Sequence, residues 1–176
     1  VDLGGGSTEV VLGDLDNGVS ASYSANVGCV RLTERCLHSD PPTAEEVAAA
    51  REVARELLGE AVQAVPVQHA RTWVGVAGTM TTLSALARGL PEYDSAAIHL
   101  SRVGFGDLTA VCDQLIGMGR AQRAALGPMH PGRVDVIGGG AIVVQELARI
   151  LAERAGIAEL VVSEHDILDG IVLSIA

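Results

Sequence analysis

The residues best suited to chemistry lie in the first nine positions, in the segment Asp2–Glu9. This segment holds two carboxylates, one at each end, and between them the residues Gly4, Gly5, Gly6, Ser7 and Thr8. Consecutive glycines let backbone N–H groups point into a common hollow, and such a hollow binds anions. Two carboxylates beside a bound phosphate would repel it unless a cation lay between them, and Mg²⁺ suits carboxylate and phosphate oxygens. We therefore expect Gly4–Thr8 to bind phosphate, and Asp2 and Glu9 to be catalytic residues that hold Mg²⁺ or another divalent cation.

A second candidate is the pair Gly78-Thr79. Thr72–Ala77 has the pattern of a buried strand, and a helix is predicted over about 80–88. A turn between a strand and a helix can present backbone amides and a hydroxyl to a phosphate, so Gly78 and Thr79 are predicted phosphate ligands. A turn that only packs remains the alternative.

Arginine is the other residue type that could contact a polyanion. Two groups stand out, and each also fits a solvated helix face: Arg31 with Arg35, and Arg120 with Arg123 and Arg133. All twelve basic residues are arginines, so a lysine-dependent nucleotide site and Schiff-base chemistry are both excluded.

Composition narrows the class of protein further. The net charge of −10 disfavours binding to nucleic acids and to anionic membranes, and an aromatic content of 2% leaves little for base stacking. Cys29, Cys36 and Cys112 lack metal-ligand spacing, which is typical of reduced thiols in a cytoplasmic protein. No apolar run reaches membrane-spanning length.

The elements that position these residues follow from periodicity and turn residues. Strands are predicted over 1–3, 7–12 and 19–27, with a hairpin turn at 16–18, and residues 28–38 as a short helix or irregular. The capping box formed by Thr43 and Glu46 opens a long helix over 43–64. Further helices are predicted over 106–117, 119–126 and 167–175, and a last strand over 158–163. Residues 133–155 fit either a strand and glycine turn leading into a helix or one long helix. The first alternative avoids placing three glycines inside a helix, which would cost about 3 kcal/mol relative to alanine.

Three meandering strands followed by alternating helices and strands predict a single α/β domain over 1–176. By fold analogy the topology is ribonuclease H-like, with a mixed five-stranded sheet and helices on both faces.

Five stretches of the chain, in order, resemble segments of the exopolyphosphatase and guanosine pentaphosphate phosphatase (Ppx/GppA) family. DLGGGSTEVVLGD is similar to the second phosphate loop of that family. The other stretches are VGCVRLTERCL (27–37), VGVAGTMTTLSAL (74–86), HPGRVDVIGGGAIVVQEL (130–147) and VVSEHDILDGIVLSIA (161–176). Val134 and Asp169 depart from the pattern of the family.

The resemblance implies the second lobe of a two-lobed, actin-like phosphatase, similar to actinobacterial exopolyphosphatases. It implies metal-assisted hydrolysis of the terminal phosphoanhydride of inorganic polyphosphate, with guanosine pentaphosphate as another possible substrate. The first lobe, which supplies a phosphate loop and a general-base Glu in the family, is absent from this chain, so the chain alone is expected to be inactive. The family pattern also favours one long helix over 133–155.

Other partners and functions remain open at this point. A homodimer is possible. A phosphate or nucleotide sensor without turnover would need the same loop but no general base. An actin-like ATPase or sugar-kinase lobe is disfavoured, because the loop ends in Ser-Thr-Glu.

Overall fold

The computed structural model describes residues 1–175, and its first three strands form an antiparallel sheet. These strands are β1 (Asp2–Leu3), β2 (Thr8–Asp14) and β3 (Gly18–Ala25), in that spatial order. Asp2 lies directly opposite Glu9 in the register. A bulge between Leu12 and Gly13 interrupts the pairing of β2 with β3. The predicted meander is therefore confirmed.

A second sheet has β6 (Glu159–Val162) at its centre. On one side β6 pairs in parallel with β4 (Trp73–Gly75), and on the other it pairs antiparallel with β5 (Arg102–Gly104). A single parallel bridge between Asp2 and Val76 joins the two sheets. The α/β class is confirmed, but the expected five-stranded sheet is two three-stranded sheets, since β5 was not predicted.

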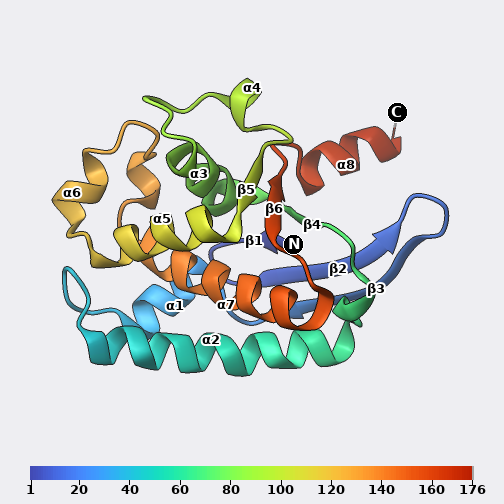
Figure 1. Cartoon of the computed structure of the whole chain (residues 1–176), viewed down its shortest axis with the longest axis horizontal. Helices are drawn as coiled ribbons and strands as arrows, with labels where there is room; N and C mark the ends of the chain where they lie inside the picture. The colour runs from blue at the N-terminus through green and yellow to red at the C-terminus, as the bar shows by residue number, and fades with distance from the viewer. Residues whose placement is uncertain (176) are drawn as a thin grey trace.

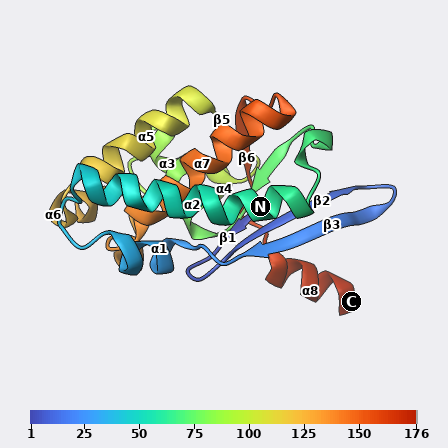
Figure 2. The same cartoon turned by 90° about the horizontal axis from the view of Figure 1, so that it is seen from below.

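Helices lie on both sides of the first sheet, as predicted. Figures 1 and 2 show α2 (Ala44–Ala64) and α7 (Ile137–Ala155) along one face of the first sheet, whereas α8 (Ile167–Ile175) lies on the opposite side. The other helices are α1 (Cys29–Cys36), α3 (Ala77–Ala87), α4 (Ser95–Ile98), α5 (Phe105–Gly117) and α6 (Arg120–Ala124), with 3₁₀ turns at Val67–His69 and Pro131–Arg133. The capping box at the start of α2 forms as predicted. Among the described helices, none has the length and apolarity needed to cross a membrane.

The glycines at the start of α7 are explained by close packing. A Cβ on Gly139 would lie 2.4 Å from the Thr33 hydroxyl oxygen in α1, and a Cβ on Gly140 would lie 2.8 Å from a methyl carbon of Thr79 in α3. The contacts with α1 and α3 require positions without side chains, so packing outweighs the low helix propensity of glycine. The long-helix alternative for 133–155 is confirmed over Ile137–Ala155.

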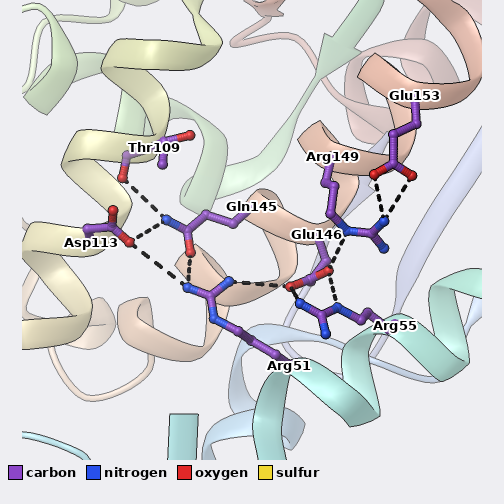
Figure 3. Close-up of polar contacts among 8 residues, drawn as sticks. All are labelled: Arg51, Arg55, Thr109, Asp113, Gln145, Glu146, Arg149 and Glu153. Carbon is purple, nitrogen blue, oxygen red and sulfur yellow. Dashed lines mark hydrogen bonds and ion pairs between the residues drawn. The ribbon is translucent and has the colours of Figure 1, made fainter. Parts of the chain in front are cut away.

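A buried carboxylate ties α7 to α2 (Figure 3). Glu146 is only 2% exposed, and it accepts hydrogen bonds from Arg51, Arg55 and Arg149 at 2.8 to 3.3 Å. The neighbouring Gln145 extends the network to α5, where it contacts backbone and side-chain oxygens. Because a buried charge is tolerated only when it is paired, this cluster fixes the register of α2 against α7.

Candidate phosphate and cation site

The glycine loop between β1 and β2 is held in place by hydrogen bonds from the first turn of α1. The first three amides of α1 donate to the carbonyl oxygens of Gly4 and Gly5 at 3.0 to 3.1 Å, and the Gly4 amide donates to Ser7 O at 3.0 Å. The loop carbonyls therefore point toward α1. Within residues 1–175, the amides of Gly5 and Gly6 donate no hydrogen bond. These amides are the donors that an anion would require.

Gly28 allows this close contact between α1 and the glycine loop. It precedes α1 in an extended conformation that any residue can adopt. A Cβ at this position would nevertheless lie 2.5 Å from the carbonyl carbon and oxygen of Gly5, and 2.7 Å from Gly4 O. The absence of a side chain at Gly28 lets the two segments touch, and this contact sets the direction of the loop amides.

Asp2 and Glu9 face each other across β1 and β2, and both are half-buried. Burial raises the pKa of Asp2, and the negative charges of Glu9 and Asp166 raise it further. Ser24, opposite Glu9 on β3, donates to its carboxylate at 2.7 Å. Like charges directly opposite on neighbouring strands are destabilising, so a cation between Asp2 and Glu9 would relieve their repulsion.

The part of the chain that the structure describes contains no cluster of three or more His, Cys, Asp or Glu residues able to enclose a metal ion. Mg²⁺, however, is commonly held by one or two carboxylates, with waters and phosphate oxygens completing its shell. The pair Asp2 and Glu9 fits a cation of this kind, bound together with phosphate, and does not fit a closed protein cage.

A second wall of the site begins where β4 turns into α3. Ala77 has a φ of 70°, a left-handed conformation that is uncommon for a residue with a side chain. Ala77 opens α3, so Gly78 and Thr79 lie in its first turn, earlier than the predicted start near residue 80. A Cβ on Gly78 would lie 2.1 to 2.3 Å from atoms of the Arg133 guanidinium, which in turn donates to Thr82 at 3.2 Å. The Arg133 guanidinium therefore lies against Gly78, in the space that a side chain at that position would fill.

The hydroxyl of Thr8, predicted to bind phosphate, is instead used inside the protein. The Thr8 side chain is fully buried, and its hydroxyl donates to Val27 O at 2.5 Å. The Thr79 side chain is 4% exposed and packs against Gly140. Thr8 can therefore offer only backbone groups to a ligand, whereas the hydroxyl of Thr79 stays a predicted phosphate ligand. Ser7, which is half-buried, keeps an accessible side chain.

The arginines divide between exposed positions, such as Arg31 and Arg35, and the buried Arg123, for which a solvated face is wrong. Arg31, in the first turn of α1, bonds to Asn26 and has a guanidinium nitrogen 3.6 Å from where a Cβ of Gly6 would be. Arg133 covers Gly78 as described above. Arg123 is 7% exposed and pairs with Asp40 at 3.2 Å. Only the position of Arg31, three residues after Gly28, gave a signal for its place beside the loop.

The site lies where the carboxyl ends of three strands meet. The glycine loop follows β1, the first turn of α3 follows β4, and the segment after β6 runs from Ser163, whose amide donates to Gly75 O at 2.9 Å, to Asp166 near Asp2. Figure 1 shows these three strands side by side. Ligands of open α/β sheets bind at such carboxyl ends. The arrangement presents amides and guanidinium groups, which suit an anion, beside two carboxylates, which suit a cation.

Comparisons with known proteins show the family of the chain. Residues 1–175 match the Ppx/GppA phosphatase family. The chain is 71% identical over 176 residues to Exopolyphosphatase 2 of Mycobacterium tuberculosis, covering all of this chain and 54% of that protein. It is 31% identical over 175 residues to the Bifunctional 3-dehydroquinate synthase/phosphatase of Fusobacterium nucleatum, covering 98% of this chain and 25% of that protein.

Solved structures of the same family have the same fold as this chain. An exopolyphosphatase-like protein superposes with a TM-score of 0.96 at 43% identity, covering 99% of this chain and 57% of that one. The PPX-GPPA enzyme of Aquifex aeolicus superposes with a TM-score of 0.85 at 30% identity, covering 98% and 55%. The expected actin-like fold is thereby confirmed. The chain spans about half the length of Exopolyphosphatase 2 and of these two structures.

Proposed function

Because the chain belongs to the Ppx/GppA phosphatase family, we propose that it is the phosphate-binding lobe of an exopolyphosphatase. The reaction is hydrolysis of the terminal phosphoanhydride bond of inorganic polyphosphate, which releases orthophosphate and leaves a chain one unit shorter. Guanosine pentaphosphate, which also carries a terminal phosphoanhydride, is the variant substrate. The observation that carries the proposal is the Asp2–Glu9 pair beside a loop in which α1 takes up the carbonyls of Gly4 and Gly5 and the amides of Gly5 and Gly6 are free.

The loop would bind the terminal phosphate. The amides of Gly5 and Gly6 donate to its non-bridging oxygens, and the Arg31 guanidinium at the rim of the loop adds positive charge. Guanidinium donors suit phosphate because they bind two oxygens in one plane. Fixed donors at the phosphate stabilise charge as it develops in the transition state, and they do so without a reorganisation cost.

Asp2 and Glu9 would hold Mg²⁺ between β1 and β2. The bound ion would supply positive charge to the phosphate oxygens, which a site with two carboxylates and a protein charge of −10 otherwise repels. Ser24 keeps one oxygen of Glu9 engaged and so fixes the orientation of its carboxylate. Burial and the charge of Glu9 raise the pKa of Asp2, and a cation beside both carboxylates would favour their ionised forms.

The base that activates the attacking water would lie outside this chain. The resemblance to the family places it on a first lobe, which would face the glycine loop across a cleft. General-base assistance is worth about 10² to 10⁴ in rate, and orientation of the water and the substrate adds to this. We therefore assign binding of phosphate and cation to this chain and activation of water to the first lobe.

The test is orthophosphate release by the two-lobed protein, in which a first lobe precedes this chain. Long-chain polyphosphate and guanosine pentaphosphate are each supplied with and without Mg²⁺. Glu9→Gln is compared with Glu153→Gln, which changes an exposed carboxylate on α7 away from the loop. Loss of release in Glu9→Gln alone supports the proposal. Equal release by both variants, or release that is independent of a divalent cation, refutes it.

A further inference from the structure

Three arginines converge on one carboxylate where α2 packs against α7, as Figure 3 shows. Glu146 on α7 is 2% exposed, and it accepts hydrogen bonds from Arg51 and Arg55 of α2 and from Arg149 of its own helix. A buried carboxylate must be paired, and one cation is enough for that purpose. The other two guanidinium groups are therefore more than the pairing of Glu146 requires.

Two further carboxylates lie at the edge of this cluster, and both are exposed. Glu153 accepts from Arg149 at 2.9 Å, and the Asp113 carboxylate on α5 lies 3.9 Å from Arg51 Nη2. Their side chains are 59% and 63% exposed, and ion pairs at exposed positions are screened by water. Because these two carboxylates oppose an added anion, the affinity of the cluster for one must come from hydrogen bonds at short range.

The donors for such hydrogen bonds are present and unused. A guanidinium carries five N–H donors, and within residues 1–175 neither Arg55 Nη1 nor Arg149 Nη2 makes a hydrogen bond. These two side chains are 49% and 43% exposed. Together with Arg51 they line a groove of about 350 Å³ between α2, α5 and α7, and Phe105 and Ala148 add apolar surface to it. The groove is therefore open to solvent and offers free guanidinium donors from two helices.

We propose that this groove binds a phosphate-class oxyanion, such as orthophosphate or the end of a phosphoanhydride chain. The planar guanidinium donates two parallel hydrogen bonds to phosphate oxygens, a geometry that other side chains do not match. The oxyanion lies between Arg55 of α2 and Arg149 of α7 and so joins the two helices. The site is separate from the glycine loop, because α2, α5 and α7 carry none of the residues assigned there. The inference therefore goes beyond the proposed function and does not rest on it.

Titration of the 176-residue chain with orthophosphate and with tripolyphosphate tests the site. EDTA removes divalent cations, which suppresses binding through a cation at Asp2 and Glu9, and sodium chloride keeps the ionic strength constant. Calorimetry measures the affinity, and NMR follows the side-chain Nε–H signals of the arginines. Arg55→Gln removes donors from the groove, and the matched control Arg154→Gln removes an exposed arginine of α7 that does not line it. Gly28→Ala, which disturbs the glycine loop, separates binding at the loop from binding in the groove.

The proposal expects saturable binding that shifts the signals of Arg55 and Arg149 in the unsubstituted chain. Arg55→Gln should weaken the affinity per folded molecule by at least about tenfold, because hydrogen bonds between charged groups are the strong ones. Arg154→Gln and Gly28→Ala should leave the affinity unchanged. The anion that binds more tightly identifies the ligand as free phosphate or as a phosphoanhydride chain.

Equal weakening in Arg55→Gln and Arg154→Gln overturns the proposal, since it indicates a general attraction by charge. Binding that is lost in Gly28→Ala and kept in Arg55→Gln overturns it in favour of the glycine loop. The absence of saturable binding, or binding that shifts neither arginine signal, also overturns it, and this readout holds even where Arg55→Gln lowers stability. None of these measurements depends on turnover, so each outcome is distinct from a failure of the phosphatase assay.

Discussion

Replacing Gly28 with alanine tests the contact that orients the glycine loop. The backbone conformation of Gly28 is open to alanine, with φ of −139° and ψ of 172°, so conformational strain plays no part. The new methyl group would lie 2.5 Å from the Gly5 carbonyl, where carbon atoms need about 3.5 Å. The loop and α1 must therefore separate by roughly 1 Å.

A separation of that size would break the three amide bonds from α1 to Gly4 and Gly5, which now measure 3.0 to 3.1 Å. Each contributes about 0.5 to 1.5 kcal/mol, so the free energy of unfolding should fall by about 2 to 4 kcal/mol. For a domain of this size the melting temperature would drop by about 4 to 16 °C. Displacement of the amide donors should also weaken phosphate binding. In an active site, a misplacement of about 1 Å can lower the reaction rate about a hundredfold.

The assay combines thermal unfolding of the 176-residue chain with titration of inorganic phosphate in the presence of Mg²⁺. Gly59→Ala is the matched control, because a Cβ there meets nothing within 4 Å inside α2 and should stabilise the protein by about 0.5 to 1 kcal/mol. An unchanged melting temperature and phosphate affinity in Gly28→Ala would refute the role of this contact. A fall in stability with unchanged affinity per folded molecule would show that the loop is structural only.

Three further outcomes are expected. Glu9→Gln in the two-lobed protein should lower turnover by about two orders of magnitude or more without loss of melting temperature, because it also removes the repulsion with Asp2; kinetics and calorimetry check this. Glu146→Gln should lower the free energy of unfolding by about 3 kcal/mol at pH 7, against less than about 1 kcal/mol for the exposed Glu153→Gln. Burial alone would raise the pKa of Glu146, but its arginines hold it below the usual value, so this stabilisation is present above the unfolded pKa and shrinks as pH falls; acid titration of unfolding in both variants measures it. The 176-residue chain should melt cooperatively and release no orthophosphate from polyphosphate, and release abolished by Glu9→Gln would contradict this.

The parts of the fold that sequence predicted are those with a local cause. The capping box and the aliphatic period predicted α2 almost to its ends, and alternation with turn residues predicted the β1–β3 meander. The Asp2–Glu9 pairing followed from a short loop between two strands, which fixes the register. Local chemistry was sufficient for these elements because each carries its own start and stop signals.

The parts that sequence did not predict depend on contacts distant in the chain. β5 has only three residues and exists because β6 offers it an edge. The burial of the Thr8 hydroxyl was not predicted, because nothing local in the sequence shows that it donates to Val27 O. Arg133 lies against Gly78 although the two residues are 55 positions apart in the sequence. No local sequence pattern predicts such a contact.

The three glycines at the start of α7 also constrain how the site can change over evolutionary time. Gly139 contacts α1, which grips the phosphate loop, and Gly140 contacts α3, whose first turn forms the second wall. A side chain gained at either position would shift both walls together, because one rigid helix supports them. Adaptation to a substrate of another size must then come from exposed rim residues such as Arg31. The glycine stretch should therefore vary little among functional descendants of this chain, while the rim diversifies.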